Sequence, residues 1–111
     1  MEQFEKKIRY AKLLAIYKDF LTHTQQDISN DYFLADLSIS EISENRDISR
    51  SAVEDAIKKS TLKLDECEEK LHISSKNEKI LVLTKKMKQK SLNCTEIQEI
   101  EEIEKELDYG I

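Results

Sequence analysis

The chain has 111 residues but contains no proline and one glycine, Gly110. Phosphate-binding loops of the P-loop or dinucleotide-binding type need several glycines, so the sequence excludes both. The tight turns of β-hairpins need residues at positive φ, for which this chain offers only asparagine and aspartate. Charged residues make up 37% of the sequence and are mostly Glu and Lys, which favour helices. We therefore predict an all-α fold.

The sequence also bears on location and on metal binding. No apolar run approaches the ~18 residues of a membrane span, and the N-terminal residues lack a signal-peptide core. Cys67 and Cys94 lie far apart and, together with His23 and His72, show no zinc-ligand spacing. We expect a cytoplasmic protein with free thiols, without a cofactor, a bound metal or insertion into a membrane.

Because glycine and proline are scarce, helix starts are identified from side-chain caps. A capping box pairs Ser or Thr with Glu or Gln three residues later, and such boxes begin at Thr22, Ser38, Ser75 and Thr95. Ser49 marks a further start, where Ile48 and Val53 are placed as a hydrophobic staple. Leu37 and Ile42 repeat that staple at Ser38. The caps and apolar spacing predict helices over about 2–21, 23–35, 39–46 and 50–72.

Apolar residues at helical spacing predict the buried face of each helix. In the long fourth helix the inward positions alternate steps of four and three, as expected for a helix packed along a partner. The predicted inward residues are Phe4, Ile8, Leu14 and Tyr17 or Phe20; Ile28, Tyr32 and Leu34; Ile39 and Ile42; and Val53, Ile57, Ser60, Leu64, Cys67 and Leu71.

The last third of the chain has segregated charges. Residues 76–90 carry six lysines against Glu78, and residues 91–111 carry seven acidic residues against Lys105. Each segment also has an apolar stripe, Ile80/Leu83/Met87 in the first and Ile97/Ile100/Ile103/Leu107 in the second. We predict an antiparallel helical hairpin over 74–111, with a turn at Ser91-Leu92-Asn93-Cys94, appended to a helical core over 1–73. Lys79, Lys86 and Lys90 share one side of the basic helix and are candidate RNA contacts, although a solvated or Glu-paired face is favoured.

The most specific feature of the sequence is a helix-turn-helix over residues 38–59. A short capped helix is followed by a turn near Asp47 and Ile48, and Ser49 caps the next helix. The turn needs one residue that tolerates positive φ, and Asp47 can take that role in place of glycine. The run Leu37–Ile42 followed by Ile48–Val53 resembles region 4 of sigma factors. The runs 49–59 and 68–73 resemble the YlxM family of small bacterial helix-turn-helix-like proteins.

The resemblance covers residues of about 1–75. It implies an all-helical homodimer and a regulatory role linked to the signal recognition particle pathway, through that particle's protein or RNA. It also implies DNA binding, on the strength of the motif.

The charge of the motif argues against DNA. Groove readers present Arg, Lys, Asn or Gln to base edges with cations beside the phosphates. Six outward residues are expected to contact nucleic acid or a partner, and two of them are carboxylates. The six are Arg50, Ser51, Glu54, Asp55, Lys58 and Lys59. Between Thr24 and His72 there are 6 basic and 12 acidic residues, a net charge of −6. Such a surface offers little counterion release on DNA binding.

Two functions remain open from the sequence. One is a regulator that acts through protein or ribonucleoprotein contacts, and the other is a sequence-specific DNA-binding regulator that uses the helix starting at Arg50. An enzyme has little support, because neither histidine has a nucleophile at a suitable spacing and no phosphate loop exists. Long amphipathic helices on a small core also predict a homodimer. The expected dimer stripe comprises Leu64, Leu71, Ile97, Ile100, Ile103 and Leu107.

Overall fold

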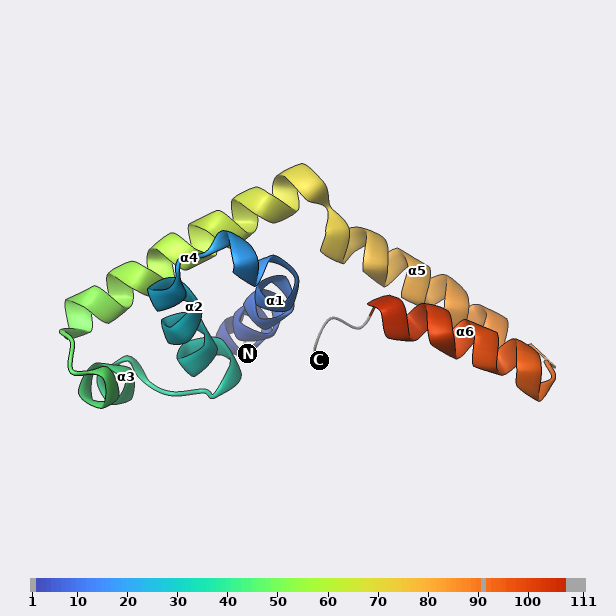
Figure 1. Ribbon diagram of the computed structural model, residues 1–111, viewed down its shortest axis with the longest axis horizontal. Helices are drawn as coiled ribbons and strands as arrows, with labels where there is room; N and C mark the ends of the chain where they lie inside the picture. The colour runs from blue at the N-terminus through green and yellow to red at the C-terminus, as the bar shows by residue number, and fades with distance from the viewer. Residues whose placement is uncertain (1, 91, 108–111) are drawn as a thin grey trace. The chain divides into compact units, whose positions relative to one another are not determined.

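The computed structural model describes residues 2–90 and 92–107, and all regular structure in these residues is helical (Figure 1). The all-α prediction is confirmed. The elements in chain order are α1 (Glu2–Tyr17), the 3-10 helix η1 (Lys18–Phe20), α2 (His23–Ser29), the π-helix η2 (Asn30–Leu34), α3 (Ile39–Arg46), α4 (Arg50–Leu71), α5 (Ile73–Lys88) and α6 (Cys94–Leu107).

The helices form two compact units that divide between Leu71 and His72. The first unit contains α1 to α4 with the two short helices, and the second contains α5 and α6. Ser91, which begins the predicted hairpin turn, and residues 108–111 lie outside the described residues.

The first two predicted helices are each interrupted near their ends. The predicted helix over 2–21 ends at Tyr17 and continues as η1, because Thr22 starts a new helix directly afterwards. The Thr22 hydroxyl accepts from the Gln25 N–H (3.2 Å), and the Gln25 amide oxygen accepts from the Thr22 N–H (3.1 Å). This capping box confirms the predicted start of α2.

The second helix changes to a π-helix at Asn30. The Ala35 N–H donates to the Asn30 carbonyl over five residues (3.0 Å), which widens the backbone relative to an α-helix. Because the wider turn changes the facing of the residues that follow, Leu34 is exposed, and the prediction that it is buried is wrong. Ile28 is buried as predicted, and Tyr32 is half-buried.

The core of the first unit lies between α4 and the three helices before it. One cluster joins Ile28, Ile42 and Val53, one from each of α2, α3 and α4, and half-buried side chains pack around it. A second group of buried side chains extends along α1 and the rest of α4: Tyr10, Leu13, Leu14, Tyr17, Leu21, Ser60, Leu64 and Cys67. The predicted inward face of α4 is therefore correct except at Leu71, which lies exposed at the end of the helix.

The predicted apolar stripe of α1 is only partly buried. Leu14 and Tyr17 are buried, whereas Phe4, Ile8 and Phe20 are exposed. The packed face carries Tyr10, Leu13, Leu14 and Tyr17, and at 3.6 residues per turn Phe4 and Ile8 lie about a third of a turn or more away from it.

Two tyrosine hydroxyls join α1 to α4. Tyr10 donates to the Asp65 carboxylate (2.8 Å), and Tyr17 donates to that of Glu68 (2.7 Å). Arg9 adds an ion pair to Asp65 (2.7 Å). Burial of Tyr10 and its hydrogen bond to Asp65 both raise the pKa of its hydroxyl, so this group stays protonated and keeps donating.

The second unit is an antiparallel pair of helices that lie side by side (Figure 1). Helix α5 begins at Ile73, after His72 takes a left-handed conformation (φ 54°), so the predicted start at Ser75 is wrong. Helix α6 begins at Cys94 instead of after Thr95. Its cap is Asn93, whose amide oxygen accepts from the Glu96 N–H (2.8 Å) while its nitrogen donates to the Glu96 carboxylate (2.9 Å).

A polar contact joins the C-terminal halves of the two hairpin helices. The buried Thr84 hydroxyl donates to the Glu104 carboxylate (2.7 Å), and Lys88 forms an ion pair with the same group. The Lys88 and Thr84 hydrogen bonds lower the pKa of Glu104 below its ordinary value, because they favour its charged form. The predicted pairing of a basic helix with an acidic one is therefore present in the hairpin.

The apolar stripe predicted to line the hairpin on α5 is not the face that packs. Thr84 is buried, and Asn77, Leu81 and Lys88 on the same side of α5 are half-buried. The Ile80/Leu83/Met87 stripe is exposed, and so is Ile103 on α6. A mixed face of α5, which meets Glu104, therefore packs on α6, and the apolar stripe lies outside.

The structure predicts very different stability effects for two leucines on α4. Leu64 has 0% exposure and Leu62 has 61%. We expect Leu64→Ala to lower the free energy of unfolding by about 2–5 kcal/mol, because it leaves a cavity in the core. Leu62→Ala, the matched control, should change it by about 0.5 kcal/mol or less. Urea denaturation followed by circular dichroism measures both, and equal losses would contradict the packing of α4.

Candidate helix-turn-helix interface

The corner between α3 and α4 is formed by Asp47 in a left-handed conformation (φ 52°, ψ 50°). The Ile48 N–H donates back to the Ser43 carbonyl (3.1 Å), and the Ser43 hydroxyl donates to the Ile48 carbonyl (2.5 Å). These two bonds close the corner on the α3 side. The predicted role of Asp47, a residue at positive φ in place of glycine, is confirmed.

Side-chain caps start both helices of the motif. The Ser38 hydroxyl accepts from the Glu41 N–H (3.1 Å), and the Glu41 carboxylate accepts from the Ser38 N–H (3.0 Å). The hydrogen bond from the Ser38 N–H is the main cause that lowers the pKa of the Glu41 carboxyl, because it favours the ionised form. At α4 the Ser49 hydroxyl accepts from the Ala52 N–H (3.0 Å). The two predicted starts are therefore correct.

The two helices of the motif share one small core. Ile42 and Val53 are fully buried against each other and Ile28, and Ile39, Ile48 and Ile57 pack around them. Leu37 packs on the same cluster, as its predicted staple with Ile42 requires. Because α2 supplies Ile28, the core of the motif is formed by three helices.

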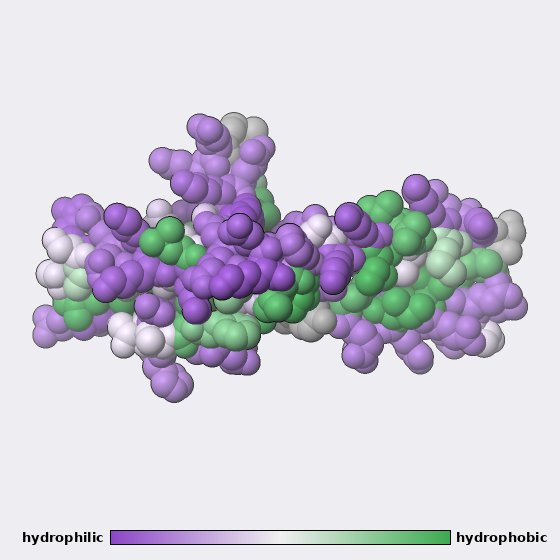
Figure 2. All heavy atoms as spheres, turned by 90° about the horizontal axis from the view of Figure 1, so that it is seen from above, coloured by the Kyte–Doolittle hydropathy of each residue, from purple (hydrophilic) through white to green (hydrophobic). Residues whose placement is uncertain are grey.

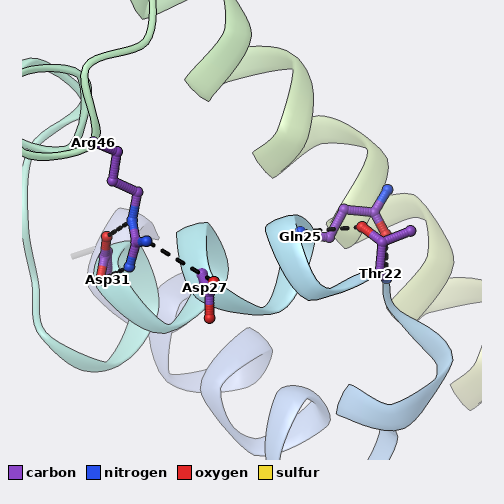
Figure 3. A network of polar contacts seen from close by, with 5 residues as sticks. All are labelled: Thr22, Gln25, Asp27, Asp31 and Arg46. Atoms are coloured by element: carbon purple, nitrogen blue, oxygen red, sulfur yellow. Dashed lines mark hydrogen bonds and ion pairs between the residues drawn. The ribbon is translucent and has the colours of Figure 1, made fainter.

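An arginine clamp ties the end of α3 to α2 and η2 (Figure 3). The Arg46 guanidinium donates to both oxygens of Asp31 (2.6 and 3.2 Å) and lies 3.9 Å from the Asp27 carboxylate. The hydrogen bonding with Asp31 raises the pKa of Arg46 above its ordinary value. Sequence reasoning missed this clamp, because the pairing spans elements and no local pattern marks it. Arg46, the basic residue at the end of α3 beside the corner, is therefore paired with carboxylates of its own unit.

The six predicted contact residues lie together on the outer side of α4, and all six are exposed. Three are cations and two are carboxylates, since Arg50, Lys58 and Lys59 accompany Glu54 and Asp55. Lys59 forms an ion pair with Asp55 (3.1 Å). Arg50 and Lys58 have no ion pair within the described residues, so they are the cations of this surface that are available to a partner.

The predicted dimer stripe is split between buried and exposed positions. Leu64 and Ile100 are buried inside their own units, and Ile97 and Leu107 are half-buried in the hairpin. Leu71 and Ile103 are exposed. The residues of the stripe that remain accessible to a second chain are therefore mainly these two.

No helix within residues 2–90 and 92–107 is long and apolar enough to span a bilayer. No group of three or more His, Cys, Asp or Glu side chains within these ranges is arranged to hold a metal ion.

The left-handed corner, the two serine caps and the shared core define a helix-turn-helix protein. The chain matches the UPF0122 family, described as "Putative helix-turn-helix protein, YlxM / p13 like", over residues 4–104. It belongs to this family. The match confirms the predicted resemblance to the YlxM proteins and extends it through most of the hairpin.

Bacterial relatives carry the same family name. A UPF0122 protein of Oceanobacillus iheyensis is 40% identical over 84 residues, which cover 76% of this chain and 80% of that protein. One from Mycoplasma capricolum is 39% identical over 83 residues, covering 75% and 74%. One from Bacillus cereus is 41% identical over 85 residues, covering 77% of each.

The left-handed corner predicts opposite effects of one substitution at two aspartates. Asp47→Gly should raise the free energy of unfolding by about 0.5–1 kcal/mol, because glycine adopts positive φ without a steric penalty. Asp55→Gly, within α4, should lower it by roughly 0.5 kcal/mol. Thermal and urea unfolding of both variants measure the effect. If Asp47→Gly instead lowers the free energy of unfolding, the Asp47 side chain stabilises the fold by more than its positive φ destabilises it.

Proposed function

We propose that this protein is a non-enzymatic cytoplasmic regulator whose helix-turn-helix binds a protein or ribonucleoprotein partner. The family and the fold support a regulatory role of the helix-turn-helix kind. By its resemblance to the YlxM proteins, the partner is the protein or RNA of the signal recognition particle. The single observation that carries the proposal is the mixed charge of the exposed face of α4.

That face is poorly suited to a phosphate-lined groove. Glu54 and Asp55 project from the first turns of α4, where a groove reader would present donors to base edges. Asp55 engages Lys59, and Arg46 at the corner is engaged by Asp31, so two of the nearby cations are already paired. Exposed carboxylates instead complement a partner with cationic side chains, where they favour association and orientation.

The alternative is a DNA-binding regulator that reads sequence through α4. It is favoured by the helix-turn-helix geometry and by Arg50 and Lys58, which are exposed and have no ion pair within the described residues. Arg50 stands at the first position of the helix, the end that approaches base edges in this motif. This alternative would be best supported by a dimer that places the Arg50 ends of its two α4 helices one DNA half-site spacing apart.

Charge reversal on α4 distinguishes the two functions. We expect the double variant Glu54→Lys/Asp55→Lys to weaken binding to purified signal recognition particle by tenfold or more, because each lost rim charge costs about 1 kcal/mol. Pulldown with that particle's protein, with and without its RNA, measures the loss. Glu69→Lys, about four turns further along α4, is the matched control and should bind normally.

A gel shift at low salt completes the comparison. The proposal expects weak binding of the wild-type chain to both random and promoter DNA, and tighter non-selective binding by the double variant. Tight, salt-sensitive binding of the wild-type chain to one operator, lost in Arg50→Ala, would overturn the proposal in favour of DNA reading.

A second part of the proposal is a homodimer formed through the α5–α6 hairpin. Apolar surface lies along this hairpin (Figure 2), with Ile80, Val82, Leu83 and Met87 exposed on α5 and Ile103 exposed on α6. Contiguous exposed apolar side chains generally mark a surface that another chain covers. The basic α5 of one copy and the acidic α6 of another have opposite charges, so two hairpins would complement each other as a four-helix bundle.

Two exposed leucines test the dimer. Leu83 on α5 has 59% exposure, close to the 61% of Leu62 on α4, so the two lose similar contacts within their own units. We expect Leu83→Asp to convert a dimer into a monomer in size-exclusion chromatography with light scattering, and Leu62→Asp to leave the dimer intact. A wild-type chain that stays monomeric at all concentrations would rule out the dimer, and an unchanged Leu83→Asp dimer would exclude this surface.

A further inference from the structure

The first unit contains a cavity of about 270 Å³ that the helix-turn-helix face does not use. Helix α1 supplies four lining residues from one side, Gln3, Lys6, Lys7 and Tyr10. The π-helix η2 supplies Tyr32 and Phe33, and α4 supplies Ile57 and Thr61. The cavity therefore lies where these three elements meet.

Its wall is made of three aromatic rings in contact. Tyr32 and Phe33 meet edge to face with centroids 5.0 Å apart, and Phe33 lies 5.5 Å from Tyr10. The Tyr10 hydroxyl donates to the Asp65 carboxylate of α4, which fixes the position of the Tyr10 ring. The π-helix places two consecutive aromatic residues at this wall, and π-helical turns occur frequently at functional sites.

The charged residues that line the cavity are cations, in a chain with a net charge of −5. Two lysines line the cavity, and no carboxylate is among the lining residues. Lys7 is already engaged, since its ammonium pairs with Asp36 (2.8 Å) and lies 4.3 Å from the centre of the Tyr32 ring. Lys6 is exposed and has no ion pair within the described residues. One cation is thus available beside an aromatic wall.

We propose that this cavity binds a small aromatic anion, with its ring at the aromatic wall formed by Tyr10, Tyr32 and Phe33 and its negative group at Lys6. Aromatic rings favour a planar partner by offset or edge contact. Small-molecule sites are typically concave and largely apolar, with a few polar groups that set orientation. Gln3 is a neutral polar residue of the lining, and so is Thr61, whose hydroxyl donates to the Lys58 carbonyl (2.9 Å).

Binding in this cavity would bear on the helix-turn-helix through α4. Ile57 lines the cavity and also packs on the Ile28–Ile42–Val53 cluster. A ligand that bridges α1, η2 and α4 binds only the folded unit, so it stabilises the arrangement that holds the motif. The site does not depend on which partner the outer face of α4 binds.

Adenosine 5′-monophosphate is a suitable probe, because it carries both a planar ring and an anion. We expect it to shift the backbone amide resonances of Lys6, Phe33 and Thr61 in two-dimensional NMR spectra of the full chain. Adenosine, which lacks the anion, should bind roughly two- to fivefold more weakly, and inorganic phosphate, which lacks the ring, at least threefold more weakly. Absence of shifts at millimolar concentration, or shifts located elsewhere, would overturn the proposal.

Substitutions at the cation and at the ring separate the two contributions. Lys6→Gln should weaken binding roughly two- to fivefold, the effect of one exposed ion pair, and Lys18→Gln outside the cavity should not. Tyr32→Leu should weaken it roughly three- to tenfold through loss of the ring. Tyr32 also packs on the core, so the NMR spectrum of the Tyr32→Leu variant must keep the dispersion of the native protein. If it does not, the Lys6→Gln result alone tests the proposal.

Binding of an oligoadenylate of eight nucleotides is the last measurement of this test. Similar or weaker affinity than the mononucleotide, with shifts confined to the lining residues, supports a small-molecule site. Much tighter binding, with shifts extending beyond the cavity, would assign the surface to single-stranded RNA and overturn the proposal.

Discussion

The left-handed turn at Asp47 is the constraint on which the functional surface depends. Because φ is 52° at this residue, α3 stops at Arg46 and α4 departs in a new direction after Ser49. Only this change of direction brings Ile42 and Val53 together over Ile28. The chain has no glycine here, so the short polar side chain of an aspartate accompanies the strained backbone. Asp36 and His72 take the same conformation at two other helix junctions.

Two of the cations around the corner form ion pairs within the first unit. Arg46, the cation closest to the corner on α3, is held by Asp31 and Asp27, and Lys59 on α4 is held by Asp55. The motif therefore has the backbone geometry of a groove reader with little of the free positive charge that groove binding uses. Arg50 and Lys58 are the cations of this surface that have no ion pair within the described residues.

The hairpin packs a mixed face of α5 and leaves an apolar face exposed. Glu104 accepts from Thr84 and pairs with Lys88 on the side of α5 that packs on α6. The Ile80/Leu83/Met87 stripe lies outside, although its spacing alone predicts an inward face. An apolar stripe in a sequence identifies a surface that needs covering, and it does not say whether the same chain or another copy covers it.

The sequence by itself determined the all-α class, the helix starts at Thr22, Ser38 and Ser49, and the role of Asp47. The helix starts and the corner depend on hydrogen bonds between residues at most five positions apart, so local sequence is enough to predict them. Tertiary structure decided the π-helix at Asn30, the exposure of Phe4 and Leu34, and the start of α5 two residues before Ser75. It also decided the Arg46 clamp and the aromatic cavity. Each of these arises where side chains from distant segments compete for the same space, and local spacing carries no information about that competition.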